Sequence, residues 1–316
     1  MSKKLSIVLI VLLSILLALV IGGMILLFNT DLGKLNFNLG PIGIHSGSST
    51  KLIDEKEIAT IKDIYVDTDV ADIDYKVSET GTIKIELYSD DPGEYSITEL
   101  EDRVNVVLKQ KEEFKVGLNF KFDKIVVYLP QNYANTLYVA GTTADINMDD
   151  FATANVKFTV TTGDIDIKAV STAEIVVTTG DIDIDSAYSV NAVATTGDYD
   201  IGTVRFLDIE ATTGDIDITE TDQLKAKTTT GDYKIGIVNS SLDIETRSGD
   251  VYVEKATVLA KSRIKTTTGD VKINRMNDGV YVEGKATTGS VKINNSDRKS
   301  EIELKINTTT GDIRVN

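Results

Sequence analysis

The stretch TTGDIDI at residues 161–167 decides the fold of this 316-residue chain. The same seven residues return at 178–184 and 212–218, and related copies continue to the end of the sequence. A degenerate copy at 142–148 precedes them. The repeat glycines are separated by 17, 17, 17, 17, 18, 20, 20 and 22 residues; they are Gly163, Gly180, Gly197, Gly214, Gly231, Gly249, Gly269, Gly289 and Gly311. Self-similarity at such a period is the signature of a repeat architecture.

Apolar and polar residues alternate on both sides of each glycine. The positions two and four residues after the glycine hold Ile, Val or Tyr, as Ile165 and Ile167 do in the first complete copy. The positions three, five and seven residues before it are mostly apolar or small. Because successive side chains of a strand point to opposite faces, each repeat predicts two short strands with buried inward columns. The glycine supplies the positive φ that a tight corner between them requires.

A repeat of 17 residues cannot bury its apolar face alone, so successive repeats must stack on one another. The pattern therefore predicts an all-β fold: residues 141–316 form a β-solenoid, similar to a β-helix, of about ten turns with 17–22 residues each. At a strand spacing of about 4.8 Å, about ten turns make a rod roughly 48 Å long.

The N-terminal part predicts a membrane anchor. Residues 5–28 are 24 residues without a charge, which is long enough for a transmembrane helix. A cleaved signal peptide is the alternative, but its apolar region is normally shorter and ends in a site of small residues. Lys3 and Lys4 lie in residues 1–4, so the positive-inside rule makes this a cytoplasmic tail of a single-pass protein of the cell membrane. The bulk of the chain is then expected to be extracellular.

Two segments separate the anchor from the repeats. Residues 29–57 are rich in Gly, Ser and Asn and predict a stalk or linker. Residues 58–140 contain alternating runs, such as 82–87, and predict an irregular β region that caps the solenoid. Within this region, residues 71–75 have the sequence ADIDY and resemble a degenerate copy of the repeat.

Composition excludes several classes of function. The 49 acidic residues against 33 Lys and Arg give a formal charge of −16, which would repel nucleic acid. The absence of Cys excludes disulfides, thiolate metal sites and Cys nucleophiles. Enzymes of β-helix fold that cleave polysaccharides need a singular pair of carboxylates, whereas here the acids recur in every repeat. The only histidine, His45, lies in the predicted stalk, so we expect no catalytic residues and no enzyme activity.

Two columns of acids are the candidate metal site. Asp follows eight of the nine repeat glycines, and Ser290 is the exception. Stacked carboxylates repel one another, so the stretch in which both columns are acidic could attract Ca²⁺, and no other cofactor is expected. The alternative interpretation is that Gly-Asp is favourable turn chemistry and that the second column is a solvated strand face. The candidate cation-binding ladder consists of Asp164, Asp166, Asp181, Asp183, Asp198, Asp200, Asp215 and Asp217.

The second column changes sign further along the chain, and its later members are Lys234, Tyr252, Lys272, Lys292 and Arg314.

A Thr column two residues before each glycine resembles the columns of ice-binding solenoids, which need two outward Thr columns. Strand alternation predicts that the neighbouring Thr points the other way. The Thr column is therefore interpreted as Thr–Thr pairing along the stack.

The TTGDIDI units, the preceding β region that ends in VYLP at 127–130, and the apolar N-terminal segment together resemble the "putative adhesin" family of Gram-positive bacteria. These are membrane-anchored β-strand-repeat proteins of unknown function. The resemblance covers most of residues 58–316. It implies a location at the cell envelope and carries no catalytic signature.

We therefore expect a non-catalytic module at the cell-envelope surface, an adhesin-like binding protein or structural scaffold displayed outside the membrane. Its expected partners are the membrane, a cell-wall polymer or an envelope protein, and a second copy through the C-terminal edge at residues 310–316; nucleic acid is not among them. One alternative is a sensor or regulator of envelope stress, although only four residues precede the membrane segment. The other is a wall-polymer binder that depends on divalent cations.

Overall fold

Strands and their connections make up the part of the chain that the computed structural model describes, namely residues 51–90, 92–110 and 123–316. The strands that precede the regular repeats are β1 (Lys51–Ile58), β2 (Asp63–Val77), β3 (Ile83–Ser89), β4 (Pro92–Glu99), β5 (Arg103–Gln110), β6 (Asp123–Leu129) and β7 (Thr136–Thr143). Because β1 begins at Lys51, the last residues of the predicted stalk belong to the β structure. The predicted transmembrane helix at residues 5–28 lies outside the described ranges, and no helix within them is long and apolar enough to cross a membrane.

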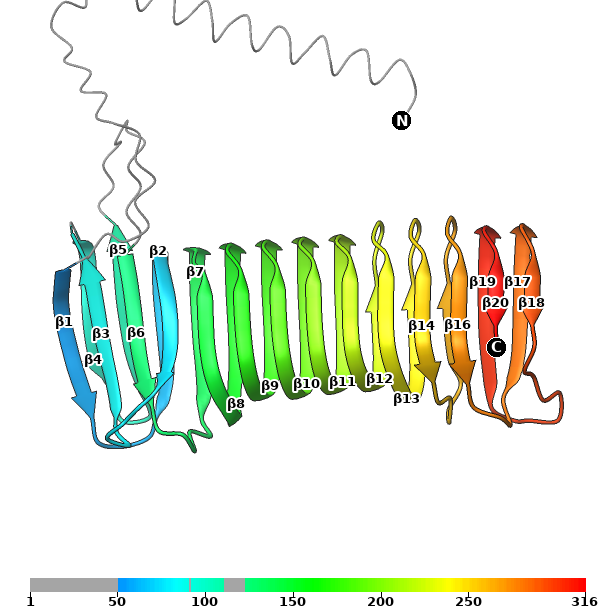
Figure 1. Cartoon of the computed structure of the whole chain (residues 1–316). Coiled ribbons are helices and arrows are strands. Elements are labelled where there is room, and N and C mark those ends of the chain that lie inside the picture. The colour runs from blue at the N-terminus through cyan, green and yellow to red at the C-terminus, as the bar shows by residue number, and fades with distance from the viewer. Residues whose placement is uncertain (1–50, 91, 111–122) are drawn as a thin grey trace, which may run out of the picture. The chain divides into compact units, whose positions relative to one another are not determined.

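The repeats stack as a parallel β-solenoid (Figure 1). In each turn, one strand segment precedes the corner glycine and another follows it; we call these the first arm and the second arm. The solenoid has about nine turns with a glycine corner, and a turn with Ala144 at the corner position precedes them. The repeat strands are β8 (Ile146–Thr162), β9 (Ile165–Thr179), β10 (Ile182–Thr196), β11 (Tyr199–Thr213), β12 (Ile216–Lys227), β13 (Tyr233–Glu245), β14 (Val251–Ala256), β15 (Ser262–Lys265), β16 (Val271–Met276), β17 (Tyr281–Thr288), β18 (Val291–Ile293), β19 (Glu303–Thr310) and β20 (Ile313–Val315).

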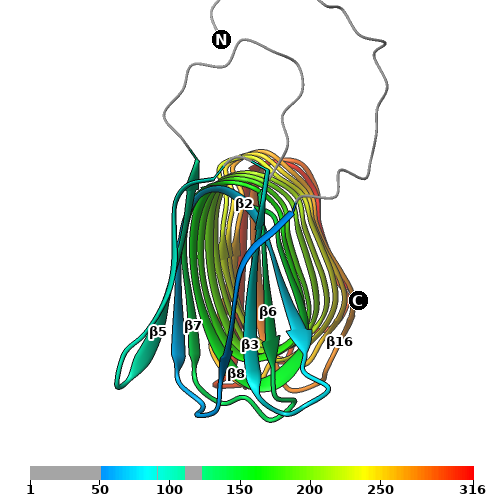
Figure 2. The ribbon, with the colours of Figure 1, turned by 90° about the vertical axis from the view of Figure 1, so that its left-hand side faces the viewer.

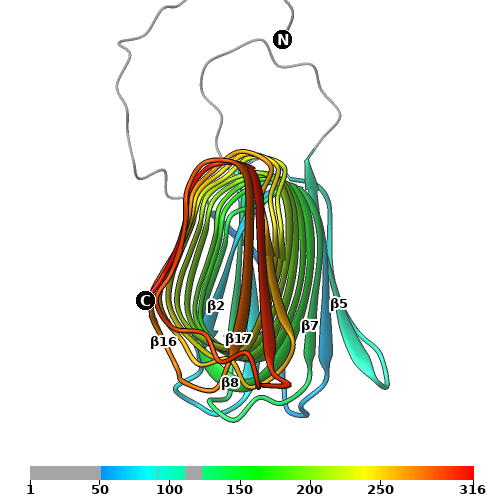
Figure 3. The same ribbon diagram turned by 90° about the vertical axis from the view of Figure 1, so that its right-hand side faces the viewer.

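The long strands β8 to β11 each serve two turns, because each forms the second arm of one turn, bends, and continues as the first arm of the next. Pairing is in register from turn to turn, so Ile182 lies between Ile165 and Tyr199. Views along the stack show the arms superposed as a flattened tube (Figures 2 and 3).

The predicted apolar columns form the core. Ile165, Ile182 and Ile216 are each 1% exposed, which confirms their predicted burial. At about 1.5–3 kcal/mol for each fully buried large apolar side chain, these columns are the main source of stability. One further column, seven residues after the corner position, fills the bend at the opposite edge of the tube and was not predicted from the sequence. Its buried members include Phe151, Val170, Val204, Val238 and Ala256.

At its N-terminal end, the stack is built out of sequence order. Strand β2 forms a complete turn with Ala71 at the corner, and it pairs in parallel with β7 and β8 on one side and with β5 and β6 on the other. The buried side chains of Ile73 and Tyr75 confirm that residues 71–75 are a repeat copy. Strands β3 and β4 then pair antiparallel with β6 and β5, and β1 pairs antiparallel with β3. These antiparallel strands close this end of the core, as a cap must.

The C-terminal end is also out of order. Strands β19 and β20 pair with β15 and β16 on one side and with β17 and β18 on the other. The last turn of the sequence therefore lies between two earlier ones, as the position of the red ribbon shows (Figure 1). The prediction that residues 310–316 form the uncovered edge is wrong. That edge is β17 and β18, where Val291 is 43% exposed, whereas Val315 is fully buried.

Repeat similarity explains the error. All turns present equivalent inward residues, so any turn can stack on any other, and neighbourhood in sequence does not decide neighbourhood in the stack. The longer spacings of 20 and 22 residues around Gly289 provide the connecting chain for this rearrangement. Burial of the Ile and Val columns is thus complete at Gly311 and incomplete at Gly289, where Ile293 is only half-buried.

Candidate functional site

The Asp that follows each corner glycine belongs to a continuous hydrogen-bonded ladder. The backbone N–H of Asp181 donates to Asp164 Oδ1 at 2.8 Å, and the N–H of Asp198 donates to Asp181 Oδ1 at 2.8 Å. Each carboxylate thus accepts the corner N–H of the next turn, and a charged acceptor makes such a bond stronger than a neutral one. In stacking order, the ladder consists of Asp145, Asp164, Asp181, Asp198, Asp215, Asp232, Asp250, Asp270, Asp312 and Ser290.

Ser290 ends this ladder because it lies in the last turn of the stack. Its N–H donates to Asp312 Oδ1 at 2.7 Å, and no further turn follows whose N–H would require a carboxylate. The hydrogen bonds from the Ser290 N–H and hydroxyl lower the pKa of Asp312. The one interruption of the Asp column in the sequence therefore marks the physical end of the solenoid.

The second acidic column stands on the second arm. Asp183 pairs in register with Asp166 and with Asp200, and Asp200 pairs with Asp217. Burial raises the pKa of Asp183, and the charges of Asp166 and Asp200 raise it further. The smaller, electrostatic part of this pKa shift is the direction that repulsion between stacked carboxylates would produce.

Lysines neutralise the two ends of this column. Lys168 Nζ lies 3.1 Å from Asp166 Oδ1, and Lys234 forms an ion pair with Asp217. Among the described residues, no ion pair involves Asp183 or Asp200. The uncompensated charge is thus concentrated at the centre of the column.

Six of the eight predicted ladder residues border one shallow groove of about 340 Å³, and Asp164 and Asp166 lie outside its lining. Within the described ranges, no group of three or more His, Asp or Glu is arranged to hold a metal ion. The corner ladder supports the turn-chemistry interpretation of its column, because one oxygen of each carboxylate accepts a backbone N–H. Cation binding by the ladder stays a prediction.

Beyond Asp217 the same column becomes basic, and its order differs from that in the sequence. Arg314 lies between Lys272 and Lys292, because the last turn is inserted at this place. Lys272 Nζ stands 5.1 Å from the ring centroid of Tyr252. The second-arm face therefore carries carboxylates along one part of the stack and cations near its distal end.

The threonine columns do not follow the predicted alternation. Thr161 and Thr178 are exposed as expected, but their neighbours Thr162 and Thr179 are exposed too. The prediction that these neighbours point inward is wrong, because the chain already turns at the corner and the strand alternation ends there. Their carbonyls take part in the stacking: the Gly163 N–H donates to the Thr179 carbonyl at 3.0 Å.

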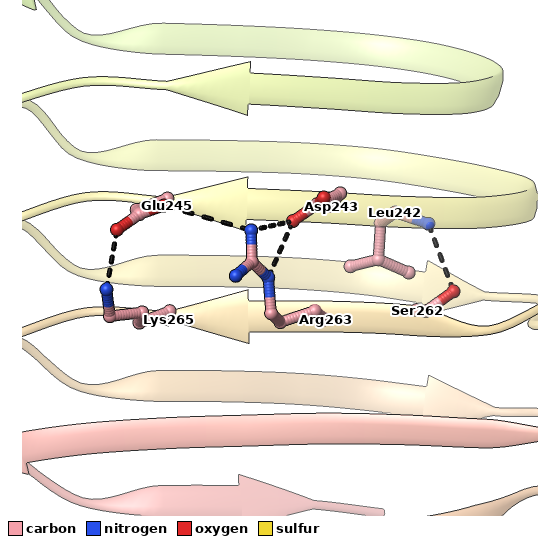
Figure 4. A network of polar contacts seen from close by, with 6 residues as sticks. All are labelled: Leu242, Asp243, Glu245, Ser262, Arg263 and Lys265. Atoms are coloured by element: carbon pink, nitrogen blue, oxygen red, sulfur yellow. Dashed lines mark hydrogen bonds and ion pairs between the residues drawn. The ribbon is translucent and has the colours of Figure 1, made fainter.

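Ion pairs that were not predicted from the sequence join successive turns across the first-arm face. Arg263 bridges Asp243 at 2.9 Å and Glu245 at 3.8 Å, and Lys265 Nζ lies 2.6 Å from Glu245 Oε1 (Figure 4). Each exposed pair of this kind contributes about 0–1 kcal/mol. The sequence feature that could have predicted these ion pairs is the presence of opposite charges at the same repeat position, 20 residues apart.

One family model and several solved structures match this chain. A family model described as Toastrack DUF4097 matches residues 61–316. A "putative adhesin" from Bacteroides fragilis has a similar structure, with 17% identity and a TM-score of 0.37 over 84% of this chain and 97% of that one. A "putative cell adhesion protein" from Clostridium sporogenes gives 12% identity and a TM-score of 0.21 over 83% and 97%. No curated protein matches the chain. These matches do not show the restriction to Gram-positive bacteria that the family resemblance implied.

Proposed function

The chain belongs to the Toastrack DUF4097 family, and we propose that it is a non-catalytic, adhesin-like module displayed outside the cell membrane by its apolar N-terminal segment. The observation that carries this proposal is the continuous stack itself. Parallel pairing and the Asp ladder hold outward side chains in registered rows along many turns. Such rows form a rigid, extended surface on which a polymer or a partner protein can make many equivalent contacts.

The non-catalytic role rests on the repetition of the acids. Asp183 has equivalents in Asp166 and Asp200 on the adjacent turns. Catalysis by two carboxylates needs one pair whose environments differ and whose separation suits a single bond in the substrate. A column of equivalent carboxylates is suited to binding rather than to chemistry at one point.

Self-association remains part of the proposal, at a different edge from the one expected. A second copy would meet the open strands β17 and β18, where Val291 is exposed, rather than residues 310–316. Unpaired strand edges are the usual place for such pairing.

Labelling of single cysteines tests the display. The chain has no Cys, so Thr195→Cys on the exposed first arm and Ser2→Cys in the predicted cytoplasmic tail are the only thiols of their variants. On intact cells, a membrane-impermeant maleimide should label the first variant and not the second. After permeabilisation, both should react. Labelling of Ser2→Cys alone on intact cells would contradict external display.

A further inference from the structure

An aromatic cluster stands on the surface where β10 and β11 bend from the second arm into the first. Tyr188 is 52% exposed, and its ring meets that of Phe206 edge to face, with 5.3 Å between the centroids. The Arg205 guanidinium lies 5.6 Å from the Tyr188 centroid and 5.3 Å from that of Phe206. We call these three residues the platform. They were not predicted from the sequence, because they lie at the bend, where the columns are irregular.

The platform is held in place before any ligand arrives. Arg205 Nε lies 3.3 Å from Asp222 Oδ2, and both rings contribute a cation–π contact to the same guanidinium. A preorganised aromatic surface loses little conformational entropy on binding. Exposed aromatic rings with polar neighbours are a common sign of a binding site.

A groove runs beside the platform along the stack. Its volume is about 340 Å³, and its polar lining includes Ser189, Asn191 and Gln223, while Phe206 forms part of its wall. A second groove, of about 290 Å³, lies on the Tyr188 side and includes Glu220. Successive turns thus offer hydroxyl and amide groups next to an aromatic ring.

The charges around the first groove are largely paired within the protein. Lys225 Nζ lies 2.7 Å from Asp208 Oδ2, and Arg263 binds Asp243 at the far end, as Figure 4 shows. An anionic polymer would have to compete with these carboxylates for Lys225 and Arg263, and Lys261 is the one lysine of the lining without an ion pair among the described residues. The strands below the groove pair on both sides, so they leave no edge for the addition of a peptide strand. These features favour a neutral ligand that is rich in hydroxyl groups.

We propose that the platform and its groove bind a neutral polysaccharide of β-1,4-linked pyranose rings. The flat C–H face of one sugar ring stacks on Tyr188, and the neighbouring sugars lie along the groove and exchange hydrogen bonds with Asn191 and Gln223. An extended chain of this kind matches a site that continues across several turns. This inference rests on the surface-module function proposed above and gives that module a ligand class.

Calorimetric titration of the purified full-length chain, in a detergent without a sugar headgroup, tests the site with cellohexaose and chitohexaose. We expect at least one of the two to bind, and Tyr188→Ala to weaken that binding roughly tenfold or more. Tyr188→Phe should retain it, because stacking needs the ring and not the hydroxyl. Tyr95→Ala is the matched control, since Tyr95 is 43% exposed but lies in β4 at the capped end.

Inorganic polyphosphate is titrated in the same way as the anionic control. The proposal is overturned if neither oligosaccharide binds, if Tyr188→Ala binds the oligosaccharide as well as Tyr95→Ala does, or if only the polyphosphate binds. A circular dichroism spectrum of each variant excludes misfolding as the cause of a loss. The measurement uses purified protein, so its failure leaves the external display untouched. Conversely, reversed labelling on cells would leave the sugar site intact.

Discussion

Substitution of Gly197 by Ala is expected to destabilise the solenoid by roughly 3–5 kcal/mol, because backbone strain and steric overlap add at this corner. The φ of Gly197 is 156°, and an added Cβ would lie 1.9 Å from the carbonyl oxygen of Gly180 in the adjacent turn. Neither backbone can retreat without breaking the ladder on both sides. The free energy of unfolding, measured by urea denaturation followed by circular dichroism, gives the size of the loss.

Gly279→Ala separates the two causes. Gly279 also has a positive φ, of 75°, but an added Cβ there would meet nothing within 4 Å. Its replacement should cost only the strain of a left-handed residue, about 1–2 kcal/mol. Equal losses for Gly197→Ala and Gly279→Ala would show that the close approach of the corners does not limit stability.

Val315→Lys is expected to reduce the free energy of unfolding by roughly 4 kcal/mol, because it places an unpaired charge in the core. Val315 is fully buried and pairs with Ile273 on one side and Ile293 on the other. Val291→Lys is the matched control, since Val291 is 43% exposed in the end turn. It should change stability by no more than about 0.5 kcal/mol.

Stacking in sequence order would invert this pair of results, because Val315 would then lie in the end turn and Val291 inside. The comparison is made by urea denaturation of both variants beside the unchanged chain. A large loss for Val291→Lys together with a small one for Val315→Lys would contradict the inserted turn.

Local pattern was sufficient to predict the corners and the inward columns. The glycine period and the alternation around Ile165 act within one repeat, and burial follows from them directly. The degenerate repeat copy at residues 71–75 could be predicted for the same reason. These features depend on which face a side chain occupies, and strand geometry determines that face.

The order of the turns could not be predicted in this way. Strand β2 lies between β6 and β8, and residues 303–315 lie between two earlier turns, because equivalent columns make many stacking orders compatible with the same pattern. One signal was present. Ser290 replaces the Asp that every turn needs to satisfy its neighbour, and only an end turn can dispense with that carboxylate.

In the candidate site too, some features could be predicted from the local pattern and others could not. Strand alternation placed Asp183 and Asp200 on one outward column, but it could not show that the corner carboxylates accept backbone N–H groups. That role depends on the distance between turns. The contact between Tyr188 and Arg205 could not be predicted, because it depends on the shape of the bend, which the repeat pattern does not describe.

Disulfide formation between engineered cysteines tests most directly the claim that the turns stack out of sequence order. The chain has no Cys, and Lys272 pairs with Arg314, whereas Lys292 lies on the far side of Arg314. Adjacent strands are about 4.8 Å apart, within the reach of a disulfide, and strands two turns apart are not. Under mild oxidation, the double variant Lys272→Cys with Arg314→Cys should therefore cross-link, and Lys272→Cys with Lys292→Cys should not. Cross-linking of the second pair, with none in the first, would contradict this account.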